Sequence, residues 1–431
     1  MKFLRAGICA LVVFGVAAHG GVEGWARAVF ETGAGLLFLI WALWISFHHE
    51  AQPVLSPLLP PLAALLLVVF GQWFFHGTAS PYQTWIELLL LFADLLVLFL
   101  AVQAFRTLED WRGFVWFGMV FCFLVSVFGI LQHLTFNGKL YWFREMHYGG
   151  IPFGPYANRN HFAAFVELLL PLSLVPLVLG KVRRERWPVI GFFAVLPIGA
   201  LFLSASRGGI LSLAIELGLL ALVMIGRGTM GKQLLSAGAI LLLALLLVSW
   251  LGVRQILQRF SSMQSLEMTE GKRASMRRDT WRIFLDHPLT GTGLGTLQTV
   301  FPPYETLYDG KIVNHTHNDY LEALAETGLA GGICCIWFIG VLFSESLKRF
   351  RKLNSSFAGA LQLSGFFACA GFLFHSLVDF NLHIPANALL FFLMAHLATT
   401  DVQQSAPPHN PLEAAPSQFS KSLTVSGLIP V

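Results

Sequence analysis

The residues Asn314 to Glu322 gather groups that could carry out acid–base chemistry. Asp319 followed by Glu322 fits a capping box, so a helix is predicted to begin here. His317 lies just before that start, and a neutral imidazole at such a place could accept a proton, as a general base does. His315 and Asn318 would support it. The alternative is a pair of solvated or interfacial histidines. A His-x-His metal site is a further alternative, but no third ligand is evident in the sequence, so we expect no metal and no cofactor.

Two arginine sites could bind an anion. Arg207 lies in the turn Ser204–Gly209 between two apolar runs, where an unpaired arginine is costly. Guanidinium matches phosphate in a bidentate way, and a following helix N-terminus would add attraction. The small flanking residues suggest that something approaches the backbone closely. The alternative is an arginine that extends to the membrane interface.

The second site is Arg277 and Arg278, in a stretch that is predicted to form a short amphipathic helix before Pro288. Trp281, Phe284 and Leu285 are expected on one side of it. The alternative is an interfacial helix on anionic lipid.

Two further polar groups stand at predicted ends of apolar runs. Arg159, Asn160 and His161 begin one run, and Asp379 follows another. Asp379 could orient an imidazole or bind a sugar hydroxyl, and simple capping of helix ends is the alternative reading.

The elements that must position these residues are membrane spans. The 431 residues are 55% hydrophobic and 12% charged, which excludes a soluble domain. A span needs about 20 apolar residues, and this spacing predicts about twelve helices. They are expected near 6–19, 28–47, 57–75, 84–103, 113–131, 161–179, 188–204, 208–225, 233–251, 321–343, 357–375 and 384–400. The N-terminal run could also be a signal peptide, but a retained first helix is the simpler reading.

The cations predict the orientation. With both termini in the cytoplasm, 14 Lys and Arg residues fall inside and five fall in short outer loops. All the polar groups described above then face outward. The expected organisation is one transmembrane domain over 1–400, with an extracytoplasmic loop at about 252–320 and a disordered cytoplasmic tail at 401–431. No basic run suits nucleic acid, and the five cysteines lack disulfide or metal spacing.

The ordered motifs over roughly 150–400 resemble the O-antigen ligase and polymerase superfamily. His317-Asn318, nine residues, then Gly328-Leu329-Ala330-Gly331 resembles a pattern associated with O-antigen ligases. The turn at Arg207, the Arg277–Gly293 segment and the Asp379–Pro385 ending also resemble parts of this family.

The resemblance implies an all-α, type C glycosyltransferase-like membrane fold in the bacterial inner membrane. It implies metal-independent transfer with inversion from an undecaprenyl-diphosphate-linked glycan at the periplasmic face. Arg207 and Arg277, or Arg278 in place of Arg277, would hold the diphosphate, and His317 would activate or orient the acceptor hydroxyl. Lipid A-core or a second lipid-linked glycan would be the acceptor. A ligase is our first expectation, a polymerase the alternative, and a lipid or polysaccharide transporter the alternative of another class.

Overall fold

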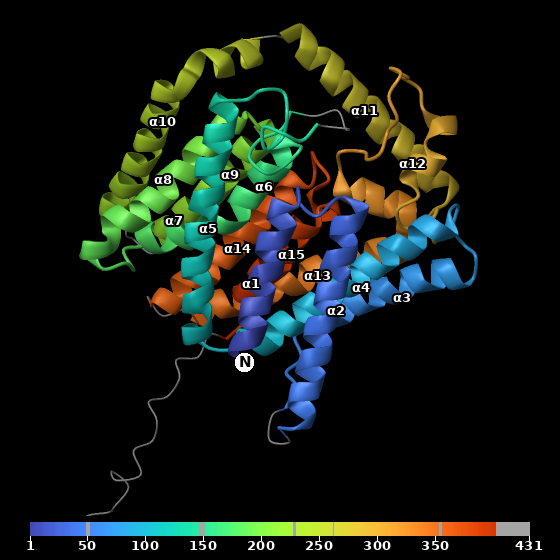
Figure 1. Ribbon diagram of the computed structural model, residues 1–431, viewed down its shortest axis with the longest axis horizontal. Helices are drawn as coiled ribbons and strands as arrows, with labels where there is room; N and C mark the ends of the chain where they lie inside the picture. Colours follow the sequence, from blue (N-terminus) through green and yellow to red (C-terminus); the bar gives the residue numbers. More distant parts are fainter. Residues whose placement is uncertain (49–51, 146–150, 227–229, 262, 353–355, 402–431) are drawn as a thin grey trace, which may run out of the picture.

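The computed structural model describes residues 1–48, 52–145, 151–226, 230–261, 263–352 and 356–401 (Figure 1). Within these ranges the regular structure is helical and contains no β-strand. The α-helices are α1 (Lys2–Ala17), α2 (Gly24–Ser46), α3 (Leu59–Phe74), α4 (Pro81–Ala104), α5 (Leu108–Leu134), α6 (Arg159–Leu169), α7 (Pro171–Val178), α8 (Trp187–Ser204), α9 (Arg207–Gly226), α10 (Met230–Ser261), α11 (Met263–Asp286), α12 (Leu297–Val300), α13 (Asp319–Lys352), α14 (Phe357–His375) and α15 (Pro385–Thr399). Three short 3-10 helices lie at Arg184–Arg186, Pro302–Tyr304 and Asn381–His383.

Many of these helices have the length and apolarity of membrane spans. Seven helices in the described ranges are long and apolar enough to cross a bilayer, and the bent pair α6–α7 would make eight. Leucines on α2 such as Leu39 and Leu43 are more than half exposed, at 56% and 62%. Exposed apolar surface of this kind suits contact with lipid. The chain is therefore a multi-pass membrane protein.

The predicted spans agree with the helices in position. Each of the predicted ranges overlaps one observed helix or the α6–α7 pair, while the total of twelve spans stays a prediction. Much of the expected loop at 252–320 is helical, because α10 continues to Ser261 and α11 follows it. The predicted tail lies outside the described residues from position 402 onward.

The centre of the bundle is formed by α14 and α15, which pack against each other and against α6, α9 and α13. α1 packs onto α15, with Leu4 and Ile8 fully buried. Figure 1 shows α10 and α11 as an arch over one end of this bundle.

Two helical segments of the bundle are interrupted. α6 and α7 meet at a 41° bend next to Pro171, which cannot donate the helical hydrogen bond. α13 is interrupted at Gly328, where φ is 61°. A Cβ at Gly328 would lie 2.4 Å from the backbone carbon of Leu289, so only glycine lets the 288–291 segment pack there.

Candidate active site

His317 and Asp379 form the central pair of the site, although 62 residues separate them. His317 Nδ1 lies 3.1 Å from Asp379 Oδ1. The carboxylate side chain is fully buried, whereas the imidazole is 24% exposed. When Nδ1–H donates to the carboxylate, the lone pair of Nε2 is left for a proton from substrate. The pair therefore has the geometry of an oriented general base.

Asp379 is fixed by two further donors. Asn160 Nδ2 donates to Asp379 Oδ2, and the backbone N–H of Phe380 donates to Oδ1 at 2.9 Å. Burial would raise the pKa of Asp379, but the hydrogen bond from His317 and the nearby imidazoles of His161 and His375 hold that pKa well below its usual range. The group is thus a carboxylate that can hold and orient His317.

The ring of Phe380 organises the surrounding histidines. His315 stacks on it at a centroid distance of 4.2 Å, and His317 and His161 meet it edge-on at 5.1 and 4.8 Å. His161 is buried, and its backbone carbonyl accepts a hydrogen bond from Asn387. Phe380 therefore fixes the directions of three of the histidines predicted for the site.

The start of α13 lies where the sequence predicts it, but its cap differs. The helix begins at Asp319, and the side chain of Asn318 accepts the N–H of Leu321 at 3.0 Å. Asn318 is therefore the capping residue, and the predicted capping box of Asp319 and Glu322 is wrong. His317, immediately before the cap, has φ 53°. A non-glycine residue in this region is strained, which is common at functional sites.

The turn at Arg207 packs against the end of α14 and the loop that carries Asp379. α9 begins at Arg207 after Ala205, whose φ of 51° reverses the chain. A Cβ at Gly208 would lie 2.5 Å from His375 Nε2. The group that approaches this backbone is therefore another part of the protein, at the end of α14. Arg207 itself is exposed beside that contact.

The pair of Glu167 and His375 was not among the predicted site residues. His375 Nδ1 lies 3.0 Å from Glu167 Oε1, and both side chains are buried. This pair joins α6 to the end of α14, next to the loop that carries Asp379. The only sequence signal for it is that each residue is a polar group in an apolar run.

Arg277 and Arg278 lie on α11, which packs against α13. Arg277 is half-buried and Arg278 is exposed. The predicted short amphipathic helix is part of a 24-residue helix. The rings of Trp281 and Phe284 lie 5.0 Å apart, as expected of residues on one side, and Phe284 is buried while Trp281 and Leu285 are exposed. Diphosphate binding by the two arginines stays a prediction.

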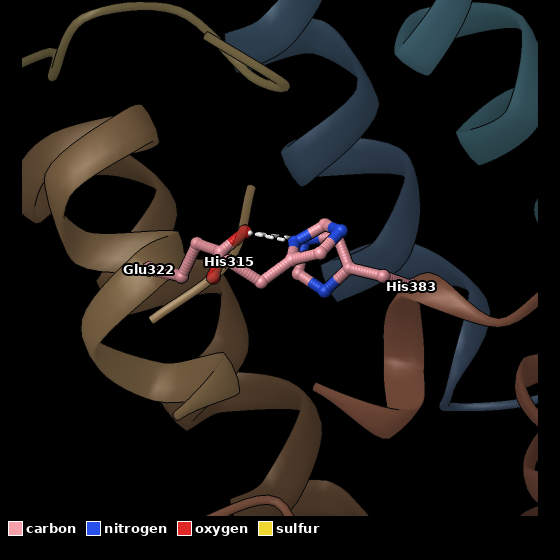
Figure 2. A group of neighbouring side chains, drawn as sticks. All are labelled: His315, Glu322 and His383. Carbon is pink, nitrogen blue, oxygen red and sulfur yellow. Dashed lines mark hydrogen bonds and ion pairs between the residues drawn. The ribbon is translucent and has the colours of Figure 1, made fainter. Parts of the chain in front are cut away.

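One group of the described residues has the composition to hold a metal ion, and Figure 2 shows its side chains facing one another. Ligand-type atoms of His315, Glu322 and His383 lie within 4.8 Å of each other. His315 Nδ1 lies 2.7 Å from Glu322 Oε1, and the other oxygen of Glu322 accepts the N–H of Thr316 at 2.8 Å. Because protein groups already bond these atoms, the arrangement is satisfied as an ion-pair network. It does not involve His317.

The structure thus brings together most of the residues predicted for the site. Asp379 bonds both His317 and Asn160. His315 and His161 pack against the neighbouring ring of Phe380. Arg159, half-buried, is the first residue of α6, next to Asn160. Five further residues of this region were not predicted as site residues, although they lie in or near the polar groups seen in the sequence: Phe380, Glu167, His375, Glu322 and His383.

Comparison with known proteins identifies one family. Residues 192–336 match the family model described as O-Antigen ligase. The matched range contains Arg207, Arg277, Arg278 and His317, and ends before Asp379. No curated protein matches the chain.

Proposed function

We propose that this chain, as a member of the O-antigen ligase and polymerase superfamily, moves a glycan from undecaprenyl diphosphate to an acceptor hydroxyl. The His317–Asp379 pair is the observation that carries the proposal. It supplies a buried carboxylate and an oriented, partly exposed imidazole at one end of a membrane bundle. The site faces the periplasm of a bacterial inner membrane, and both termini lie in the cytoplasm.

In the proposed reaction, the oxygen of the acceptor hydroxyl attacks the anomeric carbon of the donor glycan. His317 Nε2 takes the proton of that hydroxyl. The bond from that carbon to the diphosphate oxygen breaks with inversion, and the electron pair leaves with the diphosphate. Asp379 balances the positive charge that develops on the imidazole. Arg207 and the Arg277–Arg278 pair hold the leaving diphosphate and stabilise its charge. No step requires a metal.

Our first candidate function is a ligase, and its proposed acceptor is lipid A-core. A polymerase that extends a second lipid-linked glycan would use the same pair of residues, with a different acceptor. A transporter is favoured by one observation, because Asp94 and Glu216 are buried with carboxyl oxygens that have no hydrogen-bond partner in the described part of the chain. Buried carboxyl groups in spans often mark transport pathways.

A transfer assay on purified protein in nanodiscs distinguishes these functions. The donor is a short undecaprenyl-diphosphate glycan, the acceptor is lipid A-core or a second carrier-linked glycan, and EDTA is present throughout. Transfer to lipid A-core that is lost in His317→Ala and Arg207→Ala supports the ligase. Growth on the carrier identifies a polymerase. Folded protein that transfers to neither acceptor would contradict the proposal and favour transport.

A further inference from the structure

Asp319 joins the two segments that carry the His317–Asp379 pair. Its backbone N–H donates to the carbonyl of Ser376 at 2.9 Å. Its carboxylate accepts the N–H of Leu382 at 3.2 Å and lies 2.9 Å from His383 Nδ1. Three contacts from one residue therefore connect the start of α13 to the loop at 376–384.

His383 lies between two buried carboxylates. Its Nδ1 faces Asp319, and its Nε2 lies 3.4 Å from Glu322 Oε1. The side chains of Asp319 and Glu322 are only 3% and 2% exposed. Two buried carboxylates need a compensating cation, and the imidazolium of His383 is placed to supply it. Burial would lower the pKa of His383, but the carboxylates of Glu322 and Asp319 raise it to about 10.

Several other ionisable groups lie near His383. His315 faces Glu322 from the 314–318 segment, and Glu326 comes from the next turn of α13. Asp94 and Glu87 of α4 line the same apolar cavity as His383 and Asp319. These α4 and α13 neighbours are carboxyl groups, and Glu87 is paired with Arg27 at 2.7 Å, so none of them supplies a cation to Asp319.

Asp319 and His383 each follow one member of the His317–Asp379 pair closely in the chain. His317 is two residues before Asp319, and Asp379 is four residues before His383. Because His317 is held at a strained φ of 53°, its position depends on how firmly the next two residues are anchored. A loose junction at Asp319 would let the imidazole move away from Asp379.

We propose that Asp319 and His383 form a charged clamp that positions the His317–Asp379 pair. This inference rests on the proposed function, since it assigns the clamp to the base of that reaction. Neither residue touches the reacting atoms. Both act through the 3.1 Å contact between His317 and Asp379.

The test compares three variants in the transfer assay. His383→Gln removes the cation but keeps a polar side chain, His383→Lys restores a cation, and Asp319→Asn removes the opposite charge. The matched control is His396→Gln on α15, since His396 is also buried and bonds a backbone carbonyl, that of Phe105, at 3.0 Å. Melting temperature and metal content are measured for every protein.

A positioning role predicts a separation of kcat from KM. We expect kcat to fall roughly 10- to 100-fold in His383→Gln and Asp319→Asn, because small misplacements of a base have effects of this size. The KM for the donor should change little, and His383→Lys should recover part of the loss. The double variant should be no slower than the slower single variant, as expected for coupled residues.

Two results would overturn the clamp. One is an unchanged kcat in folded His383→Gln. The other is one bound divalent metal per chain that is lost in His383→Gln, because the group would then be a metal site. Failure of the proposed function looks different, since His317→Ala would then transfer normally or the parent protein would not transfer at all.

Discussion

At the scale of single residues, the proposed mechanism depends on the charge of Asp379. Asp379→Asn keeps the shape of the side chain but removes the carboxylate that orients His317 Nδ1–H. We expect kcat to fall about 100-fold, within the range typical of general-base catalysis. Asn160→Ala is the control, because it removes a donor to Asp379 without changing its charge. Equal losses in the two variants would argue against an orienting charge.

A second prediction for single residues concerns pH and His383. Its pKa is raised to about 10 from an ordinary value of about 6.5. The stabilisation that it contributes is therefore complete below pH 6.5 and is lost as pH rises toward 10. Melting temperature in detergent should fall between pH 7 and 10 more steeply for the parent than for His383→Gln. Parallel curves would show that His383 is not the cation between the carboxylates.

The individual site residues could be predicted better than their contacts. His317, Asn160 and Asp379 stand out in the sequence as polar groups at the ends of apolar runs. Their bonds join α6, α13 and the loop after α14, and no local pattern reports such long-range pairing. The capping box at Asp319 failed because Glu322 bonds Thr316 and His315, which left Asn318 to cap the helix.

At the scale of elements, the helices follow from the lengths of the apolar runs, while their packing does not. The turn before α9 illustrates this limit. Its glycines predicted a close approach, but only the structure shows that His375 and Val378 are the approaching groups. Gly208 therefore lets the Arg207 turn pack against the end of α14 and the loop that carries Asp379.

This packing gives a prediction with a matched control on one helix. Gly208→Ala would place Cβ 2.5 Å from His375 Nε2, whereas nothing lies within 4 Å of a Cβ at Gly218. Gly208→Ala should destabilise the protein by about 1–3 kcal/mol, as overpacking does, and should reduce transfer. Gly218→Ala should be neutral or slightly stabilising. Equal melting temperatures and activities for the two variants would show that the contact at Gly208 is unimportant.

At the scale of the whole molecule, the proposal requires the site and the α13 C-terminus to lie on opposite sides of the membrane. Cysteines introduced at Ile312, 74% exposed, and at Lys348, with a side chain 66% exposed, test this in intact cells. An impermeant thiol reagent should label Ile312→Cys directly and Lys348→Cys only after the inner membrane is permeabilised. The parent, whose five cysteines are buried or half-buried, is the control for background labelling. The reverse pattern would place the site in the cytoplasm.

The whole bundle also explains why the site can be partly exposed and still well ordered. Its residues come from the ends of α6, α9, α13 and α14. The helices α6, α9 and α13 all pack against α14, and α15 packs against α6, α13 and α14. The Glu167–His375 pair and the contacts of Asp319 hold these ends together.

The most direct test of the central claim is the single-turnover rate of glycan transfer by His317→Ala in the presence of EDTA. The protein is first loaded with undecaprenyl-diphosphate glycan, and acceptor is then added, so that donor binding and transfer are measured separately. If His317 is the general base, the variant binds donor like the parent and transfers at least roughly 100-fold more slowly. Transfer by His317→Ala at the parental rate would contradict that role.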